Sequence, residues 1–535
     1  VGGDIEQTQG TLIIDNIDWL NSLTIDSSED SNLVLHNVNH LGNLFMKGGS
    51  LFLTVNHENN IHDDEYAKGA IHLDNAEFTG GVTTTMIRDT AQLRLGEENT
   101  FLLIDASGTI SALSAKGIDQ NLFSSSLTLG FDTEFDLSPD GKQLLLHIKR
   151  TQSLEDLVRD ADNVSSDSNT NQRVDDLASH LDDLINVGSP LQILDYLQAY
   201  SSSPNELANN LNSLIPMSRD NYIKTAHVGL IKSLDVSKSN ALAEDKNFWA
   251  VYYYANGRYN GDNEDRCDIH QANSIQLGYN IYKNINEKNQ QKQAFGVLGG
   301  VSLGDMRNYD FNTDILSLNA GGMYRYQQYN HILNFTVIYS LSSFDTNRDY
   351  FISTNEVPSS LTFANLDRSR LQSSSNIHEV FGEAQYSYEY KIMDTGATLT
   401  PKLFIAPSVL YGNSYVERGP YSAVEVKSQT IPILESGGGI DLTQMFELNN
   451  GSLGFSIGSD MFYRHYEIPS KQIAFEGTPF GTTLGEKTAF DGLVVIPRVA
   501  TNYYFKSSKL GVFYQRESSK NYFENTIGFS YRYNF

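Results

Sequence analysis

The chain of 535 residues carries 65 acidic and 38 basic side chains, so its formal net charge is −27, which argues against nucleic acid as a partner. Only 19% of the residues are charged and 11% are aromatic, a composition that excludes a disordered acidic tail and favours ordered β structure. The length predicts two or more folding units, and Cys267, as the lone cysteine, excludes an intrachain disulfide and a cysteine metal cluster.

The first 150 residues consist of short apolar runs that Gly, Asn and Asp separate. The runs read TLIIDNI, NLVLHNV, SLFLTVN, AIHLDNA, AQLRLGE and TFLLIDAS. Many short strands with turn residues between them are typical of a stacked β-solenoid or a β-sandwich, and we expect the solenoid. The chain starts at VGGDIEQTQG without a basic or apolar leader, so we expect that a signal peptide has been removed or that the chain is a fragment.

Residues 151–246 change to a helical period. One face of the run RVDDLASHLDDLI collects Val174, Leu177, Leu181, Leu184 and Ile185. Ser189-Pro190 and Ser203-Pro204 each match a capping box with proline at the first helical position, so a helix should begin at each pair. The stretch DADNVSSDSNTNQ at 160–172 has the composition of a linker.

One more helix is expected at about 218–238. Pro216 ends the preceding helix, and Ser218 can cap the next one. Its apolar positions follow at helical spacing and are Tyr222, Ile223, Ala226, Leu230 and Leu234.

From residue 247 onward the period is two. Apolar side chains alternate with small or polar ones in twelve segments of about 9–13 residues, from NFWAVYYYANG to the terminal NTIGFSYRYNF. The sequence lacks a run of about 18 apolar residues, which argues against a transmembrane helix. Strands of about this length cross a bilayer when tilted, so a transmembrane β-barrel is expected.

Two features favour the barrel over a soluble sandwich. The polar positions are rich in Gly, Ser, Asn, Thr and Gln, and aromatic residues crowd the segment ends, as in a barrel with a polar lumen and aromatic girdles. The connections also alternate between long ones (258–271, 343–377, 412–428 and 466–490) and short ones (326–331, 391–396 and 505–508). Glu379, Glu383 and Arg498 should then face the lumen, where they are solvated or contact a pore helix.

Three stretches resemble the autotransporter (type V secretion) family. GFSYRYNF is similar to its outer-membrane targeting signature, with Phe529, Tyr531, Tyr533 and Phe535 at alternate positions. SPNELANNLNSLIPMSRDNYIKTA resembles the helical run before the family's barrels. TFLLIDASGTISALSAKGI and FDLSPDGKQLLLHIKR resemble the last rung of a β-helical passenger.

The resemblance implies three regions: the end of a β-helical passenger at 1–150 with an autochaperone-like rung at about 101–149, a linker and helical segment at 151–246, and a translocator barrel at 247–535. It implies a monomeric barrel of twelve antiparallel strands in the outer membrane of a Gram-negative bacterium, with the 218–238 helix in its pore and the passenger on the cell surface. The implied partners are the lipid bilayer, lipopolysaccharide, the barrel assembly machinery and periplasmic chaperones.

The fate of the passenger stays open in the sequence. The family often cuts the chain inside the pore helix at a motif with paired asparagines, but Asn209-Asn210 lies too early here. Release and display without cleavage are therefore both open.

Because ATP is not available outside the inner membrane, folding of the emerging passenger can drive export, and we expect Leu144, Leu145 and Leu146 to seed that folding.

Apparent chemical motifs do not fit their templates. His57, Glu58 and His62 have the spacing HExxxH instead of the zinc motif HExxH, and the acidic loop Asp262–Asp268 lacks EF-hand spacing. The stretch GTTLGEKT at 481–488 fails the P-loop spacing, and G-x-S-x-G does not occur. We therefore expect a non-enzymatic surface protein without cofactor or metal, whose passenger is an adhesin-like or other binding or display domain, a virulence factor for which a host-surface ligand is one expected partner. The alternatives are a stand-alone porin and the carrier of an enzymatic passenger.

Overall fold

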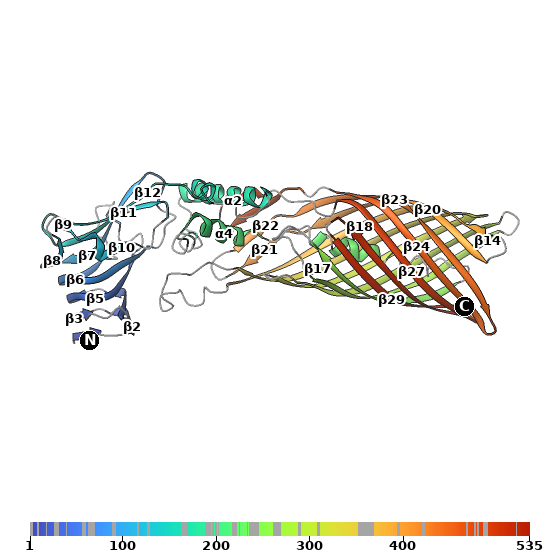
Figure 1. Cartoon of the computed structure of the whole chain (residues 1–535), viewed down its shortest axis with the longest axis horizontal. Coiled ribbons are helices and arrows are strands. Elements are labelled where there is room, and N and C mark those ends of the chain that lie inside the picture. Colours follow the sequence, from blue (N-terminus) through green and yellow to red (C-terminus); the bar gives the residue numbers. More distant parts are fainter. Residues whose placement is uncertain are drawn as a thin grey trace.

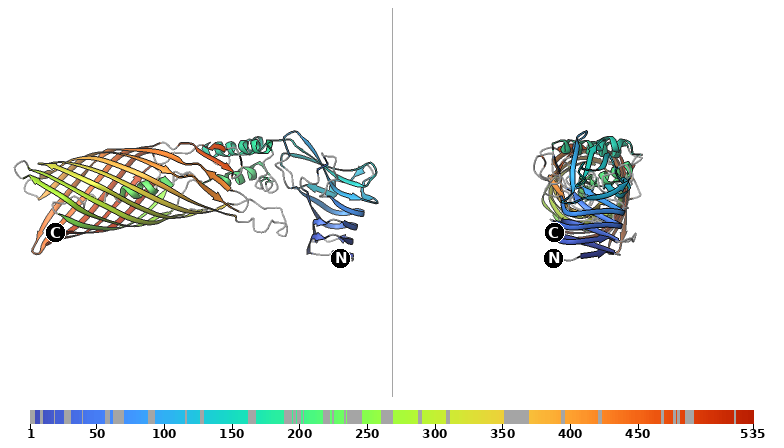
Figure 2. Two further views of the ribbon diagram at one scale, coloured as in Figure 1. Left: turned by 180° about the vertical axis from the view of Figure 1, so that it is seen from behind. Right: turned by 90° about the vertical axis from the view of Figure 1, so that its left-hand side faces the viewer.

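The computed structural model places three parts in a row: a stack of β-strands, a group of helices and a long barrel (Figure 1; Figure 2). It describes residues 4–7, 10–17, 19–25, 31–38, 40–55, 60–61, 70–87, 93–114, 117–125, 129–161, 168–187, 194, 197, 201, 203–216, 222–223, 225–232, 234, 246–259, 269–286, 290–307, 311–350, 369–392, 396–419, 423–466, 469–475, 478, 481–484, 491–520 and 522–535.

The N-terminal stack contains twelve described strands and one 3₁₀ turn. They are β1 (Asp4–Gln7), β2 (Gly10–Ile17), β3 (Leu20–Ile25), β4 (Ser31–Val38), β5 (His40–Val55), β6 (Ile71–Ile87), β7 (Glu98–Ala106), β8 (Ile110–Ser114), β9 (Gly117–Ile118), η3 (Gln120–Leu122), β10 (Phe123–Ser125), β11 (Phe131–Leu137) and β12 (Gln143–Arg150).

Most ladders in this stack are parallel. The strands β1, β3, β5 and β6 follow one another, and β2 and β4 pair beside them. Leu20, Leu41 and Leu73 lie in register on successive strands and are buried, so each layer covers the apolar side chain of the next. The strands β7, β12 and β11 pair antiparallel at the end of the stack. This stacking agrees with the expected solenoid, which stays a prediction.

Among the described residues, the helices α1 (Leu154–Arg159), α2 (Ser168–Asn186) and α4 (Pro204–Leu214) follow the stack. The side chain of Ser203 accepts a hydrogen bond from the N–H of Glu206, so the predicted cap of α4 is confirmed. The expected linker at 160–172 is wrong from Ser168 onward, because α2 starts there and buries its leucine face among the helices. The expected helix starts at Ser189 and Ser218 lie outside the described residues.

The C-terminal part is a closed antiparallel barrel. Its strands are β13 (Asn247–Tyr259), β14 (Ile269–Asn286), β15 (Gln291–Arg307), β16 (Phe311–Gln328), β17 (His331–Tyr350), β18 (Ser369–Tyr388), β19 (Tyr390–Ile392), β20 (Ala397–Gly412), β21 (Tyr415–Arg418), β22 (Ala423–Val426), β23 (Gln429–Leu448), β24 (Gly451–Tyr466), β25 (Lys471–Phe475), β26 (Gly481–Leu484), β27 (Gly492–Phe505), β28 (Ser508–Ser519) and β29 (Tyr522–Asn534). Without the short β19, β21, β22, β25 and β26, twelve long strands close the barrel, as predicted.

Two expectations about the connections were wrong. The alternation of lengths fails twice, because only residues 308–310 separate β15 from β16 and only 520–521 separate β28 from β29. The expected polar loops at 412–428 and 466–490 contain the strands β21, β22, β25 and β26, which pair with one another and extend the wall. Their apolar side chains at Tyr415, Val424 and Phe475 join one buried cluster with α1, α2 and α4.

Candidate functional site

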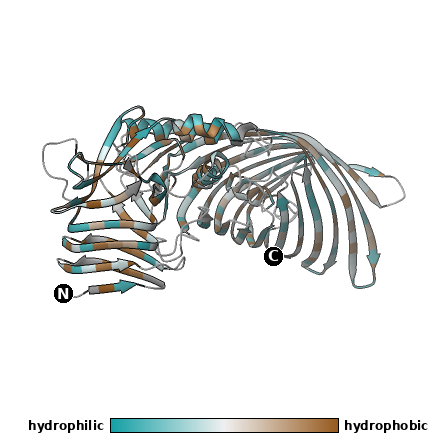
Figure 3. Cartoon of the chain, turned by 60° about the vertical axis from the view of Figure 1, so that its left-hand side comes forward, coloured by the Kyte–Doolittle hydropathy of each residue, from teal (hydrophilic) through white to brown (hydrophobic). Residues whose placement is uncertain are grey.

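The outer face of the barrel is apolar. In β14, Ile275, Leu277 and Ile281 are 46–49% exposed, whereas the intervening Ser274 and Gln276 are buried. The same alternation of exposed apolar and buried polar side chains recurs along the other long strands, so apolar side chains coat the outer wall. Figure 3 shows the matching change between hydrophobic and hydrophilic residues along these strands. Such a surface requires an apolar medium outside, and a closed barrel supplies every strand with neighbours on both sides. None of the described helices is long and apolar enough to span a membrane.

The terminal strand shows the same alternation of exposed apolar and buried polar side chains. The strand β29 pairs with β28 on one side and with β13 on the other, which closes the barrel. Phe529, Tyr531 and Tyr533 point outward and are 38–55% exposed, whereas Thr526 and Ser530 are buried. The two-residue alternation therefore persists up to Phe535 because the last strand is a full part of the wall. The role of these residues in targeting stays a prediction.

A helix lies inside the barrel (Figure 1), and residues 222–223, 225–232 and 234 are its described part. The five apolar positions expected in a pore helix are all less than 5% exposed: Tyr222, Ile223, Ala226, Leu230 and Leu234. Leu230 and Leu234 pack in one cluster with Trp249 of β13. The Trp249 ring covers Gly278, where a Cβ atom would come within 2.1 Å of it, so glycine is required at that position.

His227 connects this helix to two strands. Its Nδ1 lies 2.5 Å from Oε1 of Glu379 in β18, and its Nε2 lies 3.3 Å from Oε1 of Glu435 in β23. All three side chains are almost completely buried. An ionised carboxylate only accepts hydrogen bonds, so an imidazole between two of them must donate from both nitrogens, which makes His227 an imidazolium.

The ion pairs continue into the wall. The Ser408 hydroxyl of β20 donates to Glu379 over 2.6 Å. Arg464 of β24 is fully buried, contacts Glu435 through Nε, and lies 3.2 Å from Glu517 of β28 through both terminal nitrogens. We call this set (Ser408, Glu379, His227, Glu435, Arg464 and Glu517) the lumen network. It joins the helix to the four strands β18, β23, β24 and β28 through charged groups.

A second ionic contact ties the helix to the last strand. Lys232 contacts Glu524 of β29, and both side chains are buried. The Tyr522 hydroxyl donates to Glu524 over 2.6 Å, and His270 Nε2 lies 3.6 Å from the same carboxylate. Near the start of the helix, the hydroxyls of Tyr222 and Thr346 lie 2.8 Å apart.

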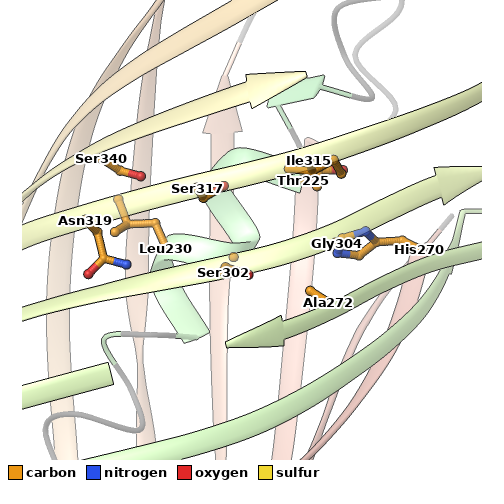
Figure 4. A pocket seen from close by; sticks show the side chains of 11 residues that line it. Thr225, Leu230, His270, Ala272, Ser302, Gly304, Ile315, Ser317, Asn319 and Ser340 are labelled. Carbon is orange, nitrogen blue, oxygen red and sulfur yellow. The ribbon is translucent and has the colours of Figure 1, made fainter. Parts of the chain in front are cut away.

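The helix leaves little free space beside it. A cavity of 20 Å³ separates Thr225 and Leu230 from the wall residues Ser302, Ser317 and Asn319 (Figure 4). This volume has room for about one water molecule. The helix therefore nearly fills the space between itself and β14–β17.

The lumen widens toward the end of the barrel where Asn247 and Asn534 pair. A chamber of 340 Å³ lies there, with Lys402, Asp441 and Arg498 in its wall. Arg498 binds Asp441 and Asp460 over 2.6 Å each, and Lys402 lies 2.8 Å from Asp460. These charges neutralise one another, so the chamber has a polar but balanced wall.

The structure confirms that Glu379, Glu383 and Arg498 face inward, and Glu379 contacts the pore helix. Sequence reasoning missed His227 and Lys232, whose signal was a histidine and a lysine in a helix expected to lie in the pore. The former metal candidates His57, Glu58, His62 and Asp262–Asp268 lie outside the described residues. Within the described ranges, no cluster of three or more side chains that could hold a metal ion is found.

Comparison with known proteins identifies the barrel. Residues 248–489 match a family model described as "Autotransporter beta-domain". These residues therefore form an autotransporter β-domain. The barrel is therefore an outer-membrane translocator domain, and its apolar outer face lies in the lipid of that membrane.

Solved autotransporter barrels show a similar but distant fold. The translocator domain of NalP from Neisseria meningitidis is 13% identical with a TM-score of 0.45, and the match covers 59% of this chain and 98% of that one. The β-domain of the Bordetella autotransporter BrkA is 10% identical (TM-score 0.38, covering 55% and 100%). The transport unit of AIDA-I from Escherichia coli is 10% identical (TM-score 0.38, covering 60% and 100%). No curated protein sequence matches the chain.

Proposed function

We propose that this autotransporter exports residues 1–150 as its passenger and holds them on the cell surface, and that the passenger is an adhesin-like domain without enzymatic activity. The observation that supports export is the helix in the barrel. It connects the N-terminal stack to β13, and its polar contacts to Glu379, Glu435 and Glu524 hold it there. A stand-alone porin would have no use for a helix that fills its bore.

Passenger folding supplies the driving force in this proposal. A domain of this size gains about 5–15 kcal/mol on folding, which makes export irreversible without ATP. Leu144 and Leu146 of β12 are fully buried, and Leu145 packs on Leu102, so the antiparallel end of the stack is a compact unit that can form first. The barrel assembly machinery, periplasmic chaperones and lipopolysaccharide are the partners that such a route requires.

Binding by the passenger has one structural support. Trp19 is 48% exposed and stacks on His40 with ring centroids 3.9 Å apart. A large exposed aromatic ring held in place by a neighbour is typical of a contact residue in a binding surface. We expect Trp19→Ala to lower attachment of bacteria to host cells, with Ile13→Ala, also exposed on the stack, as the matched control. Equal attachment by both variants would argue against this surface.

Two measurements test the export function. In planar bilayers the whole chain should conduct weakly, and a deletion of 222–234 should raise the conductance, because the helix leaves little free space beside it. A whole chain that conducts as freely as the deletion would favour a porin.

On intact cells, added protease should remove residues 1–150 but spare the barrel. Protection of the stack from protease would refute surface display.

A further inference from the structure

Four prolines lie in the long barrel strands: Pro401 and Pro407 in β20, Pro432 in β23 and Pro497 in β27. Pro401 lies opposite the break between β18 and β19, and Pro432 precedes the ladder of β23 with β24, whereas Pro407 and Pro497 each lie inside a ladder. Proline lacks the N–H that a strand donates to its neighbour, so it is rarely found inside a sheet. The ladders show the consequence. Between β18 and β20 the pairing runs to Phe381–Ser408, skips the two positions Gly382–Pro407 and Glu383–Ala406, and resumes at Ala384–Ile405 in the same register.

The ladder between β27 and β28 has the same defect. Val495 pairs with Ser518, and the next pair in the same register is Arg498 with Gln515, so the ladder skips the positions of Ile496 and Pro497. The other ladders between neighbouring long strands of the described barrel continue without such a gap, apart from one bulge between β14 and β15. Four adjacent strands, β20, β23, β24 and β27, are therefore bounded on both sides by a weakened ladder. We call these four strands the panel.

The outer face of the panel is also hollowed. A hollow of 520 Å³ lies on this apolar face. Nine of its eleven lining residues belong to the panel, among them Leu399, Ile440 and Pro497, and Tyr514 and Arg516 belong to β28. The hollow therefore extends across the panel and includes the second gap.

Inside the barrel, the lumen network crosses both gaps. Glu379 of β18 accepts from Ser408 of the panel across the first gap. Arg464 of the panel reaches Glu517 of β28 across the second. His227 joins the two halves, because it contacts Glu379 outside the panel and Glu435 within it. The bracing is therefore complete only when the pore helix is seated.

We propose that the panel is the movable section of the barrel wall and that His227, as a positioning residue, locks it. While the bore holds a passing chain instead of the helix, the panel swings outward at the two proline gaps and widens the lumen. Arrival of the helix places an imidazolium between Glu379 and Glu435, which draws the panel back against β18. This inference concerns how the wall moves and does not depend on what the passenger binds.

Hydrogen exchange on the whole chain in detergent micelles tests the lock. In His227→Gln, amides beside the gaps (381–385, 405–409, 495–499 and 515–518) should exchange about ten-fold faster than in the wild type, because exchange reports local opening. The β15–β16 ladder at 297–302 and 317–322 should not change. The matched control is Thr225→Val, which removes a different buried polar contact of the same helix, the one to Met306.

Restoring the missing donors provides an independent test. Pro407→Ala together with Pro497→Ala returns an N–H to each ladder, and exchange beside the gaps should become slower than in the wild type. Combined with His227→Gln, the two alanines should cancel most of the acceleration. The proposal is overturned if His227→Gln accelerates exchange equally in all strands or not at all. It is equally overturned if the two alanines leave exchange beside the gaps unchanged, a result that can be read even when His227→Gln does not fold.

Discussion

Replacement of Arg464 by methionine should destabilise the barrel strongly. Arg464 is fully buried between Glu435 and Glu517, and methionine fills a similar volume without a charge. In the variant, Glu435 would keep its contact with His227, whereas Glu517 would lose its contact with Arg464. Removal of one partner from a buried ion pair typically costs about 3–5 kcal/mol, because the remaining charge stays out of water.

Guanidinium unfolding of the refolded chain in micelles, followed by tryptophan fluorescence, measures this loss, because Trp249 is fully buried in the barrel. Arg307→Met is the matched control: its side chain is 60% exposed beside Asp305, so its ion pair should contribute at most about 1 kcal/mol. Adding Glu517→Gln to Arg464→Met should recover part of the loss, because one unpaired carboxylate is removed. A loss below about 1 kcal/mol for Arg464→Met alone would show that the lumen hydrates the network, and the electrostatic account would fail.

Three smaller changes test the regions outside the membrane. Leu146→Asp places a carboxylate at a fully buried position of β12 and should abolish surface display of the passenger, measured by antibody binding to intact cells, whereas the exposed control Lys149→Asp should not. Ser203→Ala removes the cap of α4 and should lower the stability of that helix by about 1 kcal/mol, measured by amide exchange. Burial lowers the pKa of His180, which stacks on Phe475, so the unfolded state binds the proton more readily. Docking of α2 should therefore weaken as the pH falls below about 6.5, and His180→Gln should remove this pH dependence of proteolysis.

The barrel could be predicted from the sequence because the lipid outside the wall and the polar lumen inside it dictate which residues alternate along each strand. Lipid outside and a polar lumen inside force a period of two on every long strand, including β29 up to its last residues. The hairpins β21–β22 and β25–β26 could not be predicted in the same way. They rise beyond the long strands, where one side packs on the helical group instead of lipid, so their composition resembles that of a loop.

The lumen network was not predictable because its members are far apart in the chain. His227 and Glu379 are separated by 152 positions, and His227 and Glu435 by 208. Only the order and register of the strands decide which inward carboxylates meet the helix, and a periodic pattern does not contain that information. The two proline gaps were missed for a related reason: a proline in a strand segment predicts an interrupted ladder, but not which neighbour loses the bond.

The spacing of the polar contacts explains how the helix finds one position in the bore. Tyr222, His227 and Lys232 are five residues apart, and at 3.6 residues per turn successive members project about 140° from each other. They therefore reach three different sectors of the wall, at Thr346 in β17, at Glu379 and Glu435 in β18 and β23, and at Glu524 in β29. A shift of the helix along the axis or a rotation about it would leave these buried groups unpaired at once, and each loss is costly. Apolar packing alone, such as that of Leu230 and Leu234 on Trp249, would hold a helix in many registers. The three ionic or hydrogen-bonded contacts therefore specify a single end state.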